Sequence, residues 1–297
     1  MGGFEPLDII CFSVDLSFSG VVTYSSLDAQ WDIHSGLCKT PNLLALDSMS
    51  SPLDSAPVRS RGIGAFVVYG ALGFLGGEIL AAIFEIFIAS LVNFPGGITA
   101  LAKASSPPWW ANASGLAGLW IGFGFSIASA RGPRGLPRWP EQWKISRNDW
   151  MFVVLGVGAQ FLIDWAYQLA GVHSLSKPVN HLFGDATGLS LVLIGALTTL
   201  GAPLMEEWFF RGFFFRALLL KMKMNSTRLR VVLSVSISAL AFAAAHAEPT
   251  EFVGLFALGV VLAYLVYRTN RLVPSVLTHV SFNAVALVSL LIQRSGH

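Results

Sequence analysis

Long apolar runs alternate with short polar segments over most of this chain, from about residue 62 onward. A helix needs about 17 to 25 mainly apolar residues to cross the hydrocarbon part of a bilayer, and several runs approach that length. The pattern therefore predicts an all-α polytopic membrane protein, a bundle of about seven to eight helices. The expected helical runs cover residues 62–94, 109–130, 150–171, 187–202, 208–220, 231–245, 252–267 and 273–292.

Composition supports a membrane location. The 297 residues are 54% hydrophobic and 12% charged, with a mean hydropathy of +0.64, whereas soluble domains carry roughly 25% charged residues. The formal net charge is only +2, and the basic residues gather at the ends of the apolar runs. We therefore expect the lipid bilayer as a partner and no nucleic acid; the sequence leaves the oligomeric state open.

The first part of the chain lacks the apolar pattern. Residues 1–60 hold scattered Asp, Ser, Gly and Thr without a sustained period, so we expect a mostly disordered N-terminal tail followed by an integral membrane domain over residues 61–297. An alternative is that translation starts at Met49. Both cysteines, Cys11 and Cys38, lie in this tail, so no cysteine can serve the membrane domain as a disulfide or metal ligand.

Lys and Arg in the short loops predict the orientation. Residues 131–147 carry five Lys or Arg, whereas residues 173–185 carry one, and basic loops face the cytoplasm. The N-terminus is then cytoplasmic, and we expect the plasma membrane. The basic segment 221–230 falls on the same side if residues 187–220 make a single crossing, bent near Pro203, or if the run 208–220 returns to its side of entry. We favour this over two full spans because proline removes a helix hydrogen bond.

Three ionisable residues lie inside one of the most apolar runs: Glu206, Glu207 and Arg211. A charged side chain near the bilayer centre costs about 2.5 to 3.5 kcal/mol on insertion scales, so such residues are usually paired and functional. Glu207 and Arg211 are i and i+4 on a helix and face each other, whereas Glu206 is rotated by about 100°. Glu206 is therefore free to act as a general base, unless all three form a purely structural ion network.

Two later polar clusters supply further chemistry. His246 ends an apolar run four residues after Phe242, and His279 with Asn283 occupies one face of the last run. A base, a group that orients water and donors for an oxyanion are the parts that amide hydrolysis needs. However, the run 252–267 is about 25 Å long as a helix, and it leaves a gap of about 10 to 15 Å in depth between the two histidines.

The series Glu-Glu-x-x-x-Arg, Phe-x-x-x-His and His-x-x-x-Asn on separate apolar runs resembles the CPBP family of intramembrane glutamic endopeptidases. This family includes the type II CAAX prenyl endopeptidases and the Abi proteins associated with bacteriocin self-protection. The resemblance covers residues 187–291, about a third of the chain. It implies a protease that cuts a membrane-associated protein or peptide, without a cofactor and without a covalent acyl-enzyme.

The resemblance also implies roles for single residues. Glu206 would activate the attacking water and His246 would help to hold it. His279 and Asn283 would donate hydrogen bonds to the oxyanion, and the Glu–Arg pair would support the site. We expect cleavage at or just inside the cytoplasmic leaflet.

Three alternatives remain open at the level of sequence. A non-catalytic membrane scaffold or bacteriocin-immunity-type protein would carry the same motifs. A zinc-dependent membrane protease could use one carboxylate and two histidines, but the chain lacks His-Glu-x-x-His and we expect no metal. A transporter is favoured only by a polar stripe, Gln160, Asp164 and Gln168, spaced i, i+4 and i+8.

Overall fold

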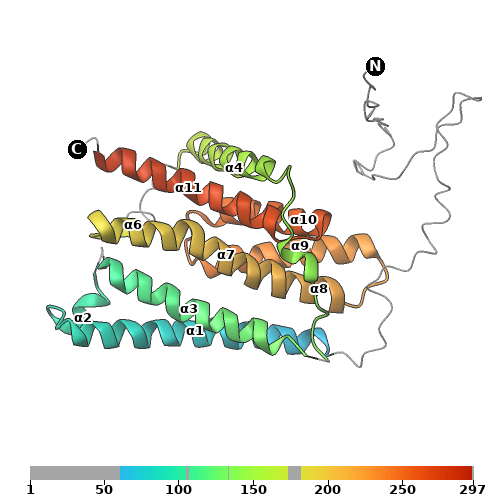
Figure 1. The fold of residues 1–297 in the computed structure, drawn as a ribbon, viewed down its shortest axis with the longest axis horizontal. Coiled ribbons are helices and arrows are strands. Elements are labelled where there is room, and N and C mark those ends of the chain that lie inside the picture. The colour runs from blue at the N-terminus through green and yellow to red at the C-terminus, as the bar shows by residue number, and fades with distance from the viewer. Residues whose placement is uncertain (1–60, 105–106, 133, 173–181, 296–297) are drawn as a thin grey trace, which may run out of the picture. The chain divides into compact units, whose positions relative to one another are not determined.

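The computed structural model describes residues 61–104, 107–132, 134–172 and 182–295, and these residues are helical with short connections (Figure 1). The expected N-terminal tail, the alternative start at Met49 and both cysteines lie outside the described residues. The helices are α1 (Ile63–Leu91), α2 (Gly97–Leu101), α3 (Trp109–Ser129), α4 (Trp150–Leu169), α6 (Gly188–Ala196), α7 (Ala202–Glu206), α8 (Arg216–Lys221), α9 (Thr227–Ala245), α10 (Phe252–Thr269) and α11 (Val273–Ser295).

Seven helical stretches among the described residues are long and apolar enough to cross a membrane. Their outer faces are apolar too: α1 exposes Leu72, Leu75 and Phe87 with more than half of each side chain uncovered. Soluble proteins rarely expose apolar patches of this extent. The protein is therefore an integral membrane protein, and the predicted all-α bundle is confirmed.

Residues Gly188–Lys221 form one such stretch, as the positions of the basic segments require. Two parts of it, Leu197–Gly201 and Glu207–Phe215, are π-helical, with α7 between them and α8 after them. Proline lacks an N–H group and crowds the preceding turn of an α-helix, and a wider π-helical turn relieves that crowding. The chain stays helical through Pro203, so the expected single crossing is confirmed as one helical stretch, and the bend near Pro203 stays a prediction.

Glycines bring α1 and α3 into close contact. A Cβ atom built on Gly122 would lie 2.0 Å from the carbonyl oxygen of Gly73, and one on Gly118 would lie 2.3 Å from the backbone nitrogen of Ala81. Ser126 donates a hydrogen bond of 2.8 Å to the Tyr69 carbonyl across the same contact. Small residues that let backbones approach are typical of helix pairs in membranes.

The ends of the helices differ in charge. Most of the Lys and Arg residues of the described chain lie at one end of the helices. We call this the basic end; it comprises residues 130–132, 134–149, 221–227 and 268–272. Arg271 binds both carboxylate oxygens of Asp149 at 2.8 Å, and this guanidinium holds the pKa of Asp149 below its usual range. The Trp139 indole donates to the Asn270 carbonyl at 3.0 Å. These contacts tie the loops of the basic end together.

Residues 92–104, 182–187 and 246–251 lie at the opposite end of the helices. There the backbone N–H of Trp109 donates to Asp185 at 3.1 Å, and Arg294 donates to the Ala186 carbonyl at 3.2 Å. The opposite end also carries Glu248 and Glu251 after α9. A basic end and a mostly acidic end therefore face opposite sides of the membrane.

Candidate functional site

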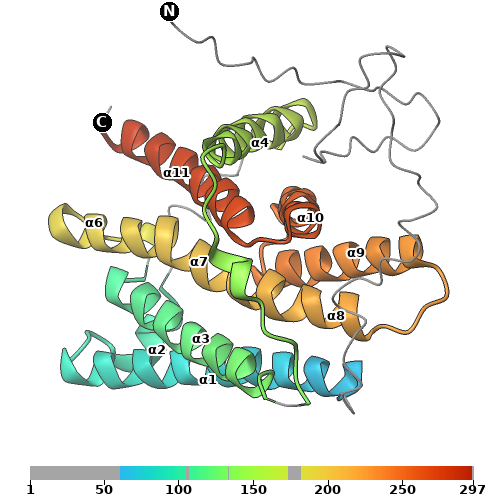
Figure 2. The same cartoon turned by 45° about the vertical axis from the view of Figure 1, so that its right-hand side comes forward.

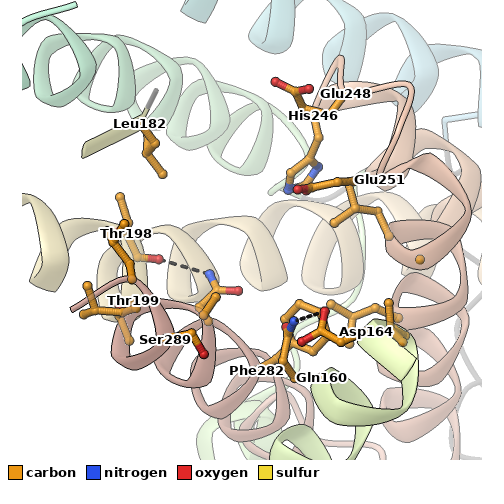
Figure 3. A pocket seen from close by; sticks show the side chains of 18 of the residues that line it. Gln160, Asp164, Leu182, Thr198, Thr199, His246, Glu248, Glu251, Phe282 and Ser289 are labelled. Atoms are coloured by element: carbon orange, nitrogen blue, oxygen red, sulfur yellow. Dashed lines mark hydrogen bonds between the residues drawn. The ribbon is translucent and has the colours of Figure 1, made fainter. Parts of the chain in front are cut away.

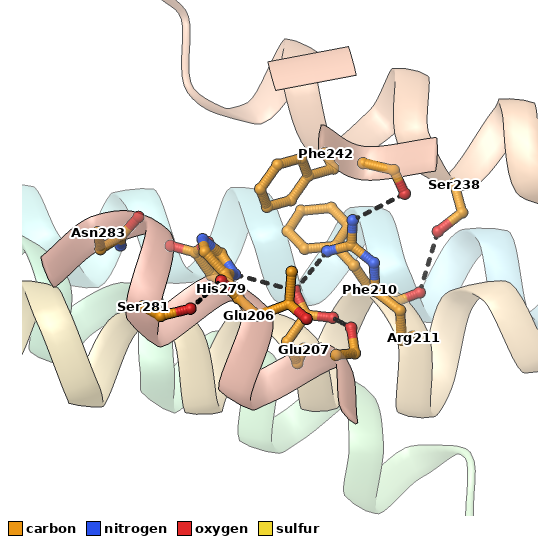
Figure 4. A network of polar contacts seen from close by, with 12 residues as sticks. Glu206, Glu207, Phe210, Arg211, Ser238, Phe242, His279, Ser281 and Asn283 are labelled. Carbon is orange, nitrogen blue, oxygen red and sulfur yellow. Dashed lines mark hydrogen bonds and ion pairs between the residues drawn. The ribbon is translucent and has the colours of Figure 1, made fainter. Parts of the chain in front are cut away.

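The two adjacent glutamates lie in different surroundings, although both belong to the same helical stretch (Figure 4). Glu207 is fully buried. Its carboxylate accepts hydrogen bonds from Arg211 at 2.7 Å, from Nδ1 of His279 at 3.0 Å and from the hydroxyl of Ser275. The ion pair predicted from the i, i+4 spacing is thus confirmed, and two partners from α11 complete it.

Arg211 links the π-helical turn to two other helices. It is fully buried and donates a hydrogen bond of 3.2 Å to the Gly259 carbonyl on α10. Its guanidinium lies 4.3 Å from the ring centroid of Phe242 on α9, a cation–π arrangement. Glu207 and Arg211 therefore fix the helix that carries Glu206 against α9, α10 and α11.

Glu206 points into a cavity. Its side chain is 15% exposed, and its Oε2 atom lies 3.8 Å from Nε2 of His279 and 3.9 Å from Nε2 of His246. Within the described part of the chain, no group donates a hydrogen bond to this carboxylate. Separations above 3.5 Å between polar atoms are too long for direct hydrogen bonds and raise the question of an intervening water.

Hydrogen bonds to Nδ1 determine the orientation of both histidine rings and which nitrogen carries the proton. Nδ1 of His246 lies 2.8 Å from the Phe242 carbonyl, which can only accept, so Nδ1 carries the proton. Nδ1 of His279 faces the Glu207 carboxylate and is protonated for the same reason. Both Nε2 atoms then point towards Glu206, and a neutral ring offers a lone pair there. A donor such as water suits the space between three acceptors.

Asn283 forms a hydrogen bond with the π-helical turn that precedes Pro203. In the π-helical turn the Ala202 N–H bonds to the Leu197 carbonyl, five residues back. The next carbonyl in this register, that of Thr198, would need the N–H that Pro203 lacks. The Asn283 amide donates a hydrogen bond of 3.1 Å to the Thr198 carbonyl in its place. One N–H of this amide is thereby used, and the second is left for a ligand.

Both histidines reach Glu206, so the gap in depth expected from the sequence is not present. Figure 2 looks almost along α10, whereas α9 runs across the view. Because α10 is steeply inclined to its neighbour, it spans less depth than its length of 18 residues implies. Phe242 also contacts both rings, with centroids 4.6 Å from His246 and 5.5 Å from His279. The predicted site residues from three helical stretches are thus brought together.

A cavity of about 1020 Å³ contains the site. Glu206, His246, His279 and Asn283 line it, and it extends from them to Glu251 at the opposite end. The cavity therefore extends towards the opposite end of the helices. The predicted polar stripe on α4 forms one wall with all three of its residues: Gln160, Asp164 and Gln168.

Sequence reasoning missed several polar groups of the site. Ser275 lies four residues before His279, on the same face of α11, and this spacing was available as a signal. The Thr198 carbonyl could have been found from Pro203, five residues later. No pattern marked Glu248 and Glu251, which follow α9 in a loop and turn towards the cavity only in the folded chain.

Residues 188–285 match the family model described as type II CAAX prenyl endopeptidase Rce1-like. The matched segment covers about a third of the chain. It runs from α6 into α11 and contains every residue of the three motifs, so the resemblance to CPBP and CAAX proteases is confirmed. No significant match is found among curated proteins or among solved structures.

The match supports the fold of a CAAX-type intramembrane protease, and proteins of the Rce1-like family are generally membrane proteases that act on a protein or peptide substrate. The zinc alternative gains no support from the geometry. Among the described residues, no group of three or more His, Cys, Asp or Glu side chains is arranged to hold a metal ion.

Proposed function

We propose that the protein is an intramembrane endopeptidase in which Glu206 activates a water molecule to hydrolyse a peptide bond of a membrane-associated protein. One observation carries the proposal. The carboxylate of Glu206 faces Nε2 of two histidines, at 3.8 and 3.9 Å, on the wall of a large cavity. This is the arrangement of a general base beside groups that orient water and bind a developing charge.

In the proposed reaction, Glu206 takes a proton from water while the water oxygen bonds to the scissile carbonyl carbon. The lone pair on Nε2 of His246 accepts the other hydrogen of the water and orients it. The carbonyl electron pair moves to oxygen, and the C–N bond then breaks. Glu206 returns its proton to the leaving nitrogen, so the chemistry needs no covalent intermediate and no cofactor.

The oxyanion would be bound by His279 and by the second N–H of Asn283. His279 can donate from Nε2 only as an imidazolium, because its Nδ1–H is already directed to Glu207. The carboxylates of Glu206 and Glu207 lie 3.8 and 3.0 Å from the two nitrogens of this ring. The supporting role of the Glu207 and Arg211 pair is therefore to hold and polarise His279.

A purely structural network explains Glu207 better than it explains Glu206. Glu207 has three partners, whereas Glu206 keeps a carboxylate at membrane depth without a hydrogen bond from the described residues. An unpaired carboxylate there is costly, which favours a catalytic role over a scaffold or immunity-type role.

For location, we propose the plasma membrane with the basic end and the N-terminus in the cytoplasm, following the distribution of Lys and Arg. The cavity extends to residues of the opposite end. We therefore revise the expected site of cleavage from the cytoplasmic leaflet to the half of the membrane away from the cytoplasm.

Substitution of the proposed base tests the function. We expect Glu206→Gln to lower peptide cleavage by about 10²- to 10⁴-fold, the usual contribution of a general base. Purified protein in nanodiscs is incubated with a mixed peptide library, and new termini are identified by mass spectrometry. Glu78→Gln is the matched control, since Glu78 lies exposed on α1 and does not line the cavity. Cleavage that survives in Glu206→Gln at the control level would refute the proposal.

A further inference from the structure

The wall of the cavity beyond the proposed catalytic groups is acidic. Asp164 on α4 and Glu248 and Glu251 from the loop after α9 line it (Figure 3). Among the described residues that line the cavity, none is Lys or Arg. Four carboxylates, Glu206 included, thus face no Lys or Arg among the described lining residues, and such a lining concentrates negative potential and attracts positive charge.

No hydrogen bond to the described chain explains the position of the Glu251 side chain. It precedes the first residue of α10 but its side chain makes no capping hydrogen bond, and no donor from the described chain reaches its carboxylate. Burial, together with the nearby charges of Glu248 and Asp164, raises the pKa of Glu251 to about 7. His246 and the Tyr167 hydroxyl are the other titratable groups that line this part of the cavity. The carboxylate is thus held where its charge is costly.

Gln160 adds an independent observation. Its amide nitrogen donates to Asp164 at 2.9 Å, which turns its Oε1 atom away from that partner. The residue is only 9% exposed, lines the cavity, and its Oε1 atom is buried without a hydrogen-bond partner in the described structure. A buried acceptor left unpaired loses its hydrogen bonds to water without replacing them. This acceptor beside Asp164 therefore calls for a donor that the described protein does not supply.

We propose that Gln160, Asp164 and Glu251 form a subsite for a cationic side chain, Lys or Arg, of the peptide substrate. The subsite rests on the proposed peptidase function and specifies its substrate class. An ammonium or guanidinium group has several N–H donors and no acceptor, which matches a wall made of acceptors. The peptide's charge offsets the desolvation of both carboxylates and satisfies the Gln160 oxygen.

Binding can be measured without turnover. We would place the full chain carrying Glu206→Gln in nanodiscs and titrate two fluorescent apolar peptides that differ only in one central residue, Lys or norleucine. Charge-assisted hydrogen bonds contribute about 1.5 to 3 kcal/mol, so the Lys peptide should bind about 10- to 100-fold more tightly. The preference should vanish when Asp164→Asn and Glu251→Gln are added, and it should persist when Glu78→Gln is added instead.

The pH dependence has a defined sign. Glu251 loses its charge as the pH falls through about 7, so the Lys preference should be larger at pH 8 than at pH 6, while the Lys peptide keeps its charge at both. Equal affinity for the two peptides, or a preference unchanged by the two acidic-site substitutions, would overturn the subsite. Because this binding assay needs no cleavage, its outcome is separate from that of the catalytic test.

Discussion

The buried cluster of Glu207 and Arg211 allows a quantitative test of the structural half of the site. We would replace Arg211 with Met, which keeps most of the side-chain volume and removes the charge. Glu207 then stays fully buried without its cation. Removing one partner of a buried ion pair typically costs about 3 to 5 kcal/mol, because the remaining charge has lost its compensation.

That cost translates into a thermal shift. For domains of about 150 to 250 residues, 1 kcal/mol corresponds to about 2 to 4 °C in Tm. Arg211→Met should therefore lower the apparent Tm in detergent by roughly 6 to 20 °C. The double variant Glu207→Gln with Arg211→Met should be less destabilised than Arg211→Met, because it leaves no uncompensated charge.

Glu206→Gln is the matched comparison in this series. Glu206 has no hydrogen bond from the described residues and faces the cavity, so its substitution should change the apparent Tm by no more than about 2 °C, which corresponds to about 1 kcal/mol or less. The reasoning is refuted if Arg211→Met melts within about 2 °C of the wild type, or if the double variant melts lower than Arg211→Met.

Two further predictions concern orientation and packing. In a chain whose two native cysteines are replaced by Ser, a membrane-impermeant maleimide added to intact cells should label Thr250→Cys at the opposite end and not Asn225→Cys at the basic end; the reverse pattern would invert the proposed topology. Gly122→Ala should lower stability by about 1 to 3 kcal/mol, because its Cβ would meet the Gly73 backbone. Gly124→Ala, with open space around it, should be neutral or stabilising; equal melting of the two variants would contradict this contact.

Features set by local spacing could be predicted from the sequence. The apolar runs gave the helices because their lengths match the bilayer, and the pairing of Glu207 with Arg211 followed from the turn of a helix. The single crossing over residues 187–220 followed from the positions of the basic segments. The helices and the ion pair depend only on residues close together in the chain, whereas the single crossing depends on how Lys and Arg are distributed along it.

Features set by packing between helices could not be predicted. His279 contacts Glu207 across 72 positions of sequence, and the inclination of α10 that allows both histidines to reach Glu206 depends on every helix around it. The wider turn by which the helix accommodates Pro203 could not be predicted either, because proline is compatible with more than one local distortion. The acidic wall of the cavity combines α4 with a distant loop, which no single segment reveals.

The wide turns of the helix over Gly188–Lys221 have a consequence for chain length. The direction of each side chain depends on the number of residues that precede it in the helix, because one added or missing residue rotates all later side chains by about 100°. A chain one residue shorter between Glu207 and Arg211 would swing the guanidinium away from its carboxylate. The Thr198 carbonyl is likewise left without a backbone partner because Pro203, which lacks an N–H group, follows it by five residues. Insertions and deletions in this helix are therefore as disruptive to the site as replacement of the glutamates themselves, whereas the loop between α8 and α9 is free to vary in length.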